Sequence, residues 1–282
     1  MRPSSLAVIG LGAIGGSLAW QARRAGVSRV VGFSSNRTDG IQALKADAIT
    51  ELADTFVESI RDAELVVLAV PPRPALDLLA ELAPRLGSGV FVTDVCSVKL
   101  EIMKQASAAG LGHRFAGGHP LAGTHQSGFS SARPDRFRGC VVYICESDSP
   151  EGHHAAQAVS GFWQHTLEAS PIRIDAAAHD RQLAWTSHLP QATATALAKA
   201  LADHGLAGVS FGSGARDTTR LAASSPEMWV DILLMNREPV GEALSQLGIQ
   251  LDELRRLVLR GDATGLETYL KAAQVFRQGL DR

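Results

Sequence analysis

Short apolar runs alternate with helical patterns over the first 175 residues of the chain. The runs are too short for helices and are rich in valine, isoleucine and leucine, as buried strands are. Helical patterns are predicted at residues 17–24 and 151–167. The predicted strands are residues 6–9, 29–33, 65–70, 90–92, 114–116, 141–145 and 172–174. This alternation predicts an α/β fold with a doubly wound, mostly parallel sheet, in which ligands bind beyond the carboxyl ends of the strands.

The pattern changes after residue 176, because no further strand-like run follows. Residues 176–204 are rich in alanine and leucine at helical spacing, with a bend expected at Pro190. Ser225 and Pro226 predict a helix start, since serine is a favoured N-cap and proline suits the first helical position. Further amphipathic helices are predicted at 244–259 and 263–278. The last third of the chain is therefore expected to be all-α.

The stretch IGLGAIGGSLA at residues 9–19 has two competing interpretations. An apolar run after Arg2 resembles a secretion signal. However, Gly10, Gly12 and Gly15 show the G-x-G-x-x-G spacing between a predicted strand and a predicted helix. In that setting the first glycine permits a tight turn, the second lets the backbone approach a pyrophosphate, and the third lets the helix pack on the strand. We therefore predict a dinucleotide-binding turn, with a glycine-rich turn that binds no ligand as the alternative.

The residues about twenty positions further on bear on the choice of cofactor. A carboxylate there would bind the ribose 2′-hydroxyl of NAD, but the chain has Ser34, Ser35, Asn36 and Arg37. Hydroxyls and a guanidinium suit a 2′-phosphate, so NADP is favoured. NAD stays the alternative if Asp39 reaches the ribose, and Arg37 is then a solvated loop residue. The expected cofactor-binding residues are Gly10, Gly12, Ala13, Ile14, Gly15, Ser34, Ser35, Arg37, Val70 and Pro71.

These patterns together predict two domains. Residues 1–175 are expected to form a Rossmann domain that binds NAD(P), and residues 176–282 a helical domain that holds substrate and dimerises. The helical part is short, so we expect it to complete a cleft and to complete its own core by pairing with a second copy.

Composition and charge narrow the class of protein. The 282 residues are 45% hydrophobic and 20% charged, with a formal net charge of −2, so no nucleic-acid or membrane partner is predicted. The longest aliphatic run has six residues, against the ~20 needed to span a bilayer. Three cysteines without a C-x-x-C pair favour a reducing, cytoplasmic compartment. The nine histidines form no compact ligand motif, so no metal is predicted.

Two polar stretches near predicted strand ends carry candidate chemistry. In GGHPLAGTHQSG at residues 117–128, His119 follows two glycines, and an imidazole is a natural acid–base group near neutral pH. The alternative is a structural histidine bonded to backbone. In TDVCSVK at residues 93–99, Ser97 and Lys99 are candidates, although Ser97 or Asp94 is equally suited to capping the next helix.

Two further candidates lie in the predicted helical domain. Ser187 and His188 fall inside the first helix, where packing is as good an explanation as function. Arg216 and Arg220 are four residues apart and would share one helix face, where a guanidinium could bind a carboxylate. The alternative for these arginines is an intrachain ion pair with Asp217 or Glu227.

These stretches together resemble the TyrA family, the prephenate and arogenate dehydrogenases of tyrosine biosynthesis. The matching segments keep the family's order along the whole chain: GLGAIGGS (10–17), DVCSVK (94–99), GGHPLAGTHQSG (117–128), HDRQLAWTSHLP (179–190) and FGSGARDTTRLAASSPEMW (211–229). The resemblance implies oxidative decarboxylation of arogenate, prephenate or both with NADP+, in a dimer formed through the helical domain.

The resemblance also implies roles for individual residues. His119 would take the proton of the substrate's ring hydroxyl, Ser97 would bond the same hydroxyl, and Arg220 would bind the ring carboxylate. The residues implied to line the substrate site are Ser187, His188, Gln191 and Thr124, with Ser213 and Trp229 supplied across the dimer.

One position departs from the pattern of many prephenate-using members, which read S-H-L-P-H. Here the last residue is Gln191, whose carbonyl can accept a hydrogen bond from the ammonium of arogenate. This favours arogenate. The other functions that the residues allow are a β-hydroxyacid dehydrogenase or imine reductase of similar architecture, and a non-catalytic NADP-sensing regulator.

Overall fold

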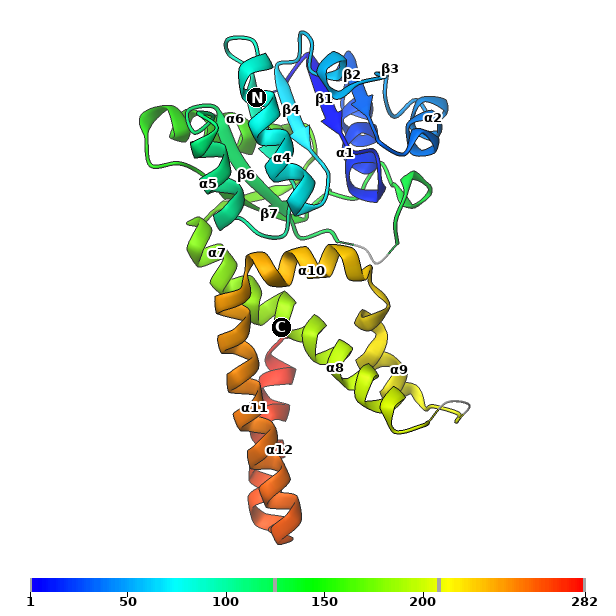
Figure 1. The fold of residues 1–282 in the computed structure, drawn as a ribbon, viewed down its shortest axis with the longest axis vertical. Coiled ribbons are helices and arrows are strands. Elements are labelled where there is room, and N and C mark those ends of the chain that lie inside the picture. The colour runs from blue at the N-terminus through cyan, green and yellow to red at the C-terminus, as the bar shows by residue number, and fades with distance from the viewer. Residues whose placement is uncertain (1, 124–125, 207–208, 281–282) are drawn as a thin grey trace. The chain divides into compact units, whose positions relative to one another are not determined.

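The computed structural model describes residues 2–123, 126–206 and 209–280 and places eight strands in one sheet (Figure 1). The strands are β1 (Ser5–Ile9), β2 (Arg29–Phe33), β3 (Glu51–Leu52), β4 (Leu65–Leu68), β5 (Phe91–Asp94), β6 (Phe115–Pro120), β7 (Val141–Cys145) and β8 (Ser170–Arg173). Their order is β3-β2-β1-β4-β5-β6-β7-β8, and only β6 and β7 are antiparallel neighbours. The predicted α/β fold with a mostly parallel sheet is therefore confirmed.

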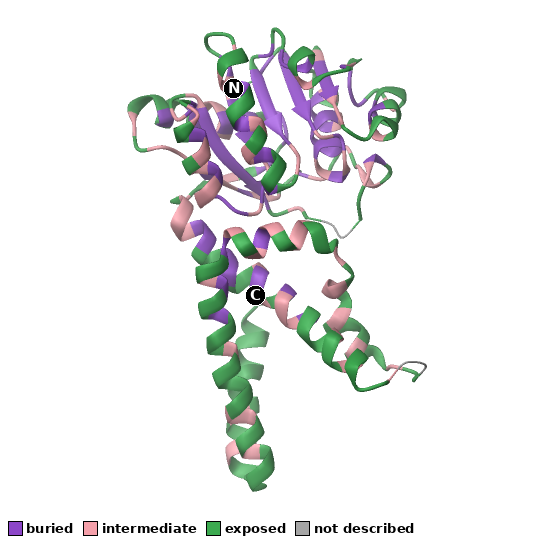
Figure 2. Cartoon of the chain, viewed as in Figure 1, coloured by how far each residue is buried: buried purple, intermediate pink, exposed green. Residues whose placement is uncertain are grey.

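Helices cover both faces of this sheet. They are α1 (Ala13–Arg24), α2 (Arg37–Lys45), α3 (Phe56–Ser59), α4 (Pro72–Leu82), α5 (Leu100–Ala108) and α6 (Pro150–His165). Alternate residues of a strand point to opposite faces. Leu6 and Val8 of β1 therefore pack with α1 and α6 in one core, whereas Ala7 and Ile9 pack with α4 and α5 in the other. Figure 2 shows the resulting sheet as the most fully buried part of the chain.

The apolar opening of the chain belongs to this sheet. β1 is completely buried between β2 and β4, and the glycine turn joins it to α1. The strand order reverses at β1, and in open α/β sheets a crevice forms at such a reversal, beyond the carboxyl ends of the strands. The stretch is thus a central structural element rather than a removable secretion signal.

β6 is longer than predicted. It continues through Gly118 and His119 to Pro120 because it pairs with β7 over these residues. Likewise, β5 includes Thr93 and Asp94. The candidate histidine is therefore held within a paired strand rather than in a loop after it.

Only helices follow β8 in the described part of the chain. They are α7 (Ala176–Leu183), η3 (Ala184–His188), α8 (Leu189–Asp203), α9 (Ser213–Thr219), η4 (Arg220–Ala223), α10 (Pro226–Met235), α11 (Arg237–Arg260) and α12 (Ala263–Gly279). The predicted all-α region is confirmed, and so is the helix start at Ser225, whose hydroxyl accepts the Met228 N–H.

The single bent helix expected at residues 176–204 is wrong in detail. A π-helical turn, η3, separates α7 from α8, with the Leu189 N–H bonded to the Ala184 carbonyl. Pro190 has no N–H to donate, so the regular i→i−4 ladder is interrupted at this point. π-helical turns inside α-helices are frequent at functional sites.

The described residues divide into two compact units, Met1–Asn236 and Arg237–Arg282. Within the second unit, α11 and α12 pack on each other and are joined at Gly261, whose φ is +65°. The Asp262 carboxylate caps α12 by accepting the Gly265 N–H. The expected domain boundary between residues 175 and 176 lies inside the first unit and stays a prediction. No described helix has the length and apolar character needed to cross a membrane.

Candidate active site

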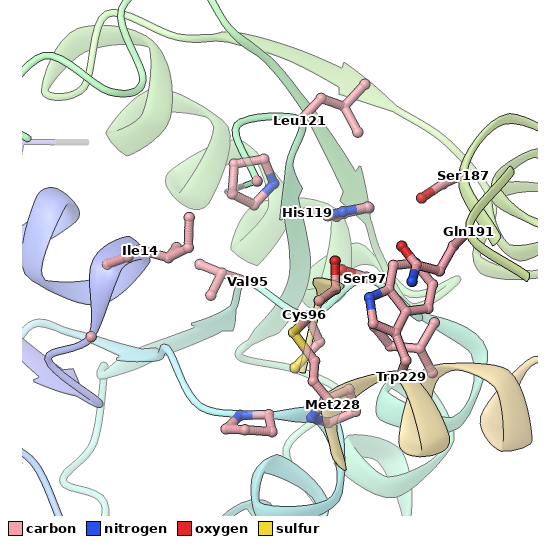
Figure 3. A pocket seen from close by; sticks show the side chains of 18 of the residues that line it. Ile14, Val95, Cys96, Ser97, His119, Leu121, Ser187, Gln191, Met228 and Trp229 are labelled. Atoms are coloured by element: carbon pink, nitrogen blue, oxygen red, sulfur yellow. The ribbon is translucent and has the colours of Figure 1, made fainter. Parts of the chain in front are cut away.

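A pocket of about 720 Å³ lies at the carboxyl ends of the central strands in the first unit. Figure 3 shows Ile14 of α1 on one side, Ser187, Gln191 and Trp229 of the helical segments on the other, and His119 between them. Eleven of the residues predicted for the site line this pocket: Gly12, Ala13, Ile14, Val70, Pro71, Ser97, His119, Ser187, Gln191, Arg220 and Trp229. Residues far apart in the sequence are thus brought together around one pocket.

The glycine turn provides space for an anion at the start of α1. Gly12 is the N-cap of the helix, no side chain caps it, and a Cβ built on it would meet nothing within 4 Å. The first turn of α1 contains no acidic residue. Free N–H groups and the helix dipole therefore suit a phosphate there.

The other two glycines of the motif are required by packing. Gly10 has a φ of +98°, and a Cβ on it would lie 2.3 Å from the Ala69 carbonyl oxygen. A Cβ on Gly15 would lie 1.9 Å from the Gly10 carbonyl oxygen, so only glycine lets α1 approach β1 this closely. These contacts and the open space at Gly12 fit a bound dinucleotide.

The residues predicted for the adenosine ribose do not line this pocket. Arg37 is the first residue of α2, not a loop residue, and its guanidinium forms a 2.7 Å ion pair with Asp54. Asn36 caps the same helix by accepting the Thr38 N–H. Ser34 is half-buried and Ser35 is exposed at the end of β2.

His119 is a buried titratable group in the lining of the pocket, with 8% of its surface exposed. Its Nδ1 lies 2.8 Å from Nε2 of His179. Burial holds the pKa of His119 well below its usual range, and His179, Lys99 and His188 lower it further. The imidazole is therefore neutral at pH 7 and can accept a proton.

His179 and Asp180 were not singled out from the sequence. His179 lies in α7, and its Nδ1 is 2.7 Å from Oδ1 of Asp180. Asp180 also accepts the N–H groups of Lys99 and Leu100, so it caps α5 from another helix. Burial would raise the pKa of Asp180, but the bonds from His179 and the two backbone N–H groups outweigh it and lower that pKa. The adjacent His-Asp pair that opens the 179–190 stretch was the available signal.

Lys99 lies behind the pocket rather than in it. Its side chain is completely buried, forms an ion pair with Asp94 and donates to the Gly118 carbonyl at 2.7 Å. Asp94 in turn accepts the N–H groups of Gly118 and Cys96. The pair therefore clamps the segment of β6 that carries His119. Neither Ser97 nor Asp94 caps α5, which leaves Ser97 free to face the pocket.

The helical side of the pocket presents an amide and a cation. The Gln191 Nε2 donates to the Leu221 carbonyl at 2.9 Å, which ties α8 to η4. Arg220 is exposed at the pocket and forms no ion pair with any residue of the described ranges, including Asp217 and Glu227. The alternative of an intrachain ion pair is therefore not realised. Trp229 lines the pocket of its own chain.

Three predicted substrate residues are not placed in the pocket. His188 is completely buried behind it, with Nδ1 3.0 Å from the Asn236 Nδ2, and its ring packs edge-on against Trp229. Ser213 begins α9 and is exposed away from the pocket lining. Thr124 lies outside the described residues. Within those residues, no group of three or more His, Cys, Asp or Glu side chains is arranged to hold a metal ion.

Two family models match the chain. The nucleotide-binding domain of prephenate dehydrogenase matches residues 18–169, and the dimerization domain of prephenate dehydrogenase matches residues 175–272. The prephenate dehydrogenase of Bacillus subtilis is 30% identical over 98% of this chain and 76% of its own length.

Two solved structures agree over nearly the whole chain. The prephenate dehydrogenase of Aquifex aeolicus, in complex with hydroxyphenyl propionate and NAD+, has a TM-score of 0.89 at 28% identity and covers 98% of each chain. The arogenate dehydrogenase of Synechocystis has a TM-score of 0.79 at 29% identity and covers 98% of this chain and 99% of its own. The chain therefore belongs to the prephenate dehydrogenase family of nicotinamide-dependent oxidoreductases, as the resemblance predicted.

Proposed function

We propose that the chain oxidises and decarboxylates arogenate, prephenate or both, with NADP+ as its preferred cofactor. The observation that carries this proposal is the placement of His119, Ser97 and Arg220 around one pocket that also contains the glycine turn of α1. The substrates are cyclohexadiene acids with a ring hydroxyl and a ring carboxylate. A base, a hydroxyl and a guanidinium are the groups that would bind and activate them.

The glycine turn and the segment that follows β4 would hold the cofactor. Gly12, Ala13 and Ile14 offer the phosphates an open helix N-terminus, while Val70 and Pro71 would pack beside the nicotinamide half. A bound nicotinamide supplies the chemistry of accepting a hydride from the ring carbon that bears the hydroxyl.

His119 would act as the general base on that hydroxyl. Its neutral ring takes the proton, so the O–H bond breaks and a new N–H bond forms as the ring carbon becomes a carbonyl carbon. Ser97 would share a hydrogen bond with the same oxygen. The carbonyl is then an electron sink for loss of the ring carboxylate as CO2, which leaves an aromatic ring.

Arg220 would bind the ring carboxylate before it leaves. A tight ion pair maintained through the whole step would hinder departure of CO2, so binding energy spent there orients the substrate rather than driving the bond cleavage. The side chain is exposed and forms no competing ion pair within the described chain, which suits this role.

Gln191 supports arogenate as the preferred substrate. Its amide nitrogen is committed to the Leu221 carbonyl, which leaves the Oε1 as the atom available to a substrate tail. A carbonyl oxygen accepts from the ammonium of arogenate but offers nothing to the keto oxygen of prephenate.

The other predicted substrate residues take secondary roles. Ser187 and Trp229 would contact the tail from the helical side. His188 would support Trp229 through their ring contact rather than touch substrate. Ser213 and Thr124 would contact the substrate only when the substrate and a second copy of the chain are bound.

NADP preference rests on the end of β2. The Ser34 and Ser35 hydroxyls suit a 2′-phosphate, and the Arg37 guanidinium would exchange Asp54 for it. An exposed ion pair is worth only about 0–1 kcal/mol, so the exchange costs little.

A homodimer through the helical domain completes the proposal. Apolar side chains of α11 and α12 are exposed in the single chain: Leu244, Ile249, Leu251, Val258, Leu259, Leu270, Val275 and Phe276. Figure 2 shows both helices as largely exposed. The matched family model is described as a dimerization domain, and burying such faces against a second copy is the ordinary solution.

We place the enzyme in a reducing, cytoplasmic compartment. Its cysteines Cys96, Cys140 and Cys145 are all unpaired. Burial raises the pKa of Cys140 to about 11 and that of Cys145 to about 12, so these two thiols stay protonated near neutral pH.

A four-way turnover assay tests the proposal. The purified chain is supplied with arogenate or prephenate and with NAD+ or NADP+, and both reduced cofactor and CO2 are measured. We expect equal amounts of the two products and the highest kcat/KM with arogenate and NADP+. Absence of turnover with all four combinations would overturn the proposed function.

A further inference from the structure

The His119 ring belongs to a buried hydrogen-bond network of three side chains. His179 uses both ring nitrogens, with Nε2 2.8 Å from His119 Nδ1 and Nδ1 2.7 Å from Asp180 Oδ1. His179 is completely buried and Asp180 is 2% exposed. The three side chains come from β6 and α7, so the network forms only when these two elements, which are distant in the sequence, pack together.

The positions of the protons in this network can be assigned by starting from Asp180. Asp180 accepts the backbone N–H groups of Lys99 at 2.8 Å and Leu100 at 2.9 Å, one on each oxygen. Burial would raise the pKa of Asp180, but its hydrogen bonds from His179 and these two backbone N–H groups lower that pKa below the ordinary value, so the carboxyl is ionised at neutral pH and has no proton to give. His179 must therefore carry its proton on Nδ1, where it donates to Asp180, and keep a lone pair on Nε2.

The tautomer of His119 follows from that of His179. Because His179 Nε2 is an acceptor, His119 Nδ1 must be the donor of the 2.8 Å bond. The opposite tautomer would place two lone pairs against each other in a buried site, which costs at least an unmade hydrogen bond. His119 Nε2 is left with the free lone pair, on a residue that lines the pocket.

We propose that His179 and Asp180 are positioning residues that hold His119 in its Nδ1-protonated tautomer, so that Nε2 is the atom that takes the substrate's proton. This inference rests on the proposed function, because it assigns the atom at which His119 acts. When the substrate O–H bond breaks, its proton binds Nε2, and the resulting imidazolium keeps its Nδ1–H bond to His179. Asp180 then lies beyond His179 as the counter-charge. This is the general arrangement in which a base is oriented by a third group.

The remaining ionisable groups around these rings leave this charge balance intact. Behind β6, Lys99 is ion-paired with Asp94. From β7, Tyr143 packs edge-on against His179, with ring centroids 5.5 Å apart. From η3, His188 is neutral at pH 7, because burial lowers its pKa to about 4. Asp180 therefore supplies the negative charge that faces the imidazolium through His179.

The experiment measures the tautomer directly and then its effect on turnover. Long-range ¹H–¹⁵N spectra of the full chain, labelled at the histidine ring nitrogens, report which nitrogen of His119 carries the proton, and His119→Asn assigns the signal. We expect Nδ1 protonation in the unmodified protein. In His179→Phe, which keeps an aromatic ring but offers no acceptor, we expect mixed tautomers and a kcat lower by about 10-fold to 1,000-fold with KM nearly unchanged.

Two further variants separate orientation from packing. His179→Gln restores a carbonyl acceptor for His119 Nδ1 and should recover a large part of kcat, which a purely structural role would not produce. His165→Phe changes an exposed histidine at the end of α6 and should leave kcat and the tautomer unchanged.

The outcomes distinguish this inference from the proposed function. If the unmodified protein turns over no substrate, the proposed function fails, while the spectrum still decides the tautomer. A proton on Nε2 of His119 in the unmodified protein overturns the inference, whatever the activity. The inference is also overturned if the His179→Phe variant keeps full kcat while the His119→Asn variant loses activity. If His179→Phe does not fold by circular dichroism, the unmodified spectrum and the His179→Gln variant carry the test.

Discussion

The proposed catalytic end of the site and the proposed ribose end differ in how their polar side chains are held. His119, His179 and Asp180 are almost completely buried and are joined to one another by hydrogen bonds. At the ribose end, the Arg37 and Asp54 side chains are 68% and 71% exposed in their ion pair. Buried polar groups are costly to leave unpaired, whereas an exposed pair exchanges partners at little cost. We therefore expect the proposed reacting end to keep its arrangement without a ligand, and the proposed ribose end to be completed by the cofactor.

The largest expected effect concerns the ion pair that supports the buried end. Lys99→Met leaves the Asp94 carboxylate buried without its cation, so we expect a loss of about 3–5 kcal/mol in the free energy of unfolding. Urea unfolding followed by circular dichroism measures it. Lys104→Met, which breaks an exposed pair with Glu101, is the control and should cost no more than about 1 kcal/mol. Equal losses in the two variants would contradict the contrast between buried and exposed polar pairs.

Arg220→Gln tests the carboxylate contact. Loss of a charge-assisted hydrogen bond is worth about 1.5–3 kcal/mol, so KM should rise about 10-fold to 100-fold, with a smaller change in kcat. Arg216→Gln, on the preceding turn of α9 and outside the pocket lining, should behave like the unmodified protein. A fall in kcat alone, with KM unchanged, would remove Arg220 from substrate binding.

Gln191→His tests tail recognition at the buried end. Replacing an acceptor that favours an ammonium should move the ratio of kcat/KM for arogenate over prephenate by about 10-fold toward prephenate, the value of one hydrogen bond. Steady-state kinetics with both substrates measure the ratio. Gln164→His, an exposed change on α6, is the matched control. A ratio that does not move would show that other groups choose the substrate.

The smallest expected effect lies at the exposed end. Arg37→Ala should raise the KM for NADP+ by up to about 10-fold and leave that for NAD+ nearly unchanged, because only the former has a 2′-phosphate. Asp54→Asn removes the competing carboxylate and should leave NADP+ binding equal or slightly tighter. If both cofactors weaken equally in Arg37→Ala, the arginine does not read the phosphate.

The predictable parts of the molecule are those encoded by nearby residues. Apolar runs in the sequence predict the central strands. The spacing of three glycines predicts the turn before α1, and the Ser225–Pro226 pair predicts the start of α10. The His119 network was not predictable in this way, because its hydrogen bonds join residues 60 and 81 positions apart. The π-helical turn was also missed, since Pro190 indicates that the ladder is interrupted but not how the chain compensates.

The ion pair of Arg37 was likewise not predictable from the spacing of nearby residues. Its spacing from the glycine turn suggested a loop residue facing a phosphate, but Asn36 provides a cap and draws Arg37 into α2. Only the packing of α2 against β3 and the following turn brings Asp54 within reach. Local spacing therefore did not indicate the partner of the Arg37 side chain.

The most direct test of the account is the pH dependence of kcat/KM for the unmodified protein beside that of His119→Asn. Burial, and then the neighbouring His179, Lys99 and His188, lower the pKa of His119, and a base acts when unprotonated, so activity should be constant from about pH 8 to pH 6.5 and fall only in more acidic solution. The variant should lose about 10²-fold to 10⁴-fold in activity together with that acid limb. A variant that retains the same rate and the same limb would show that another group is the base.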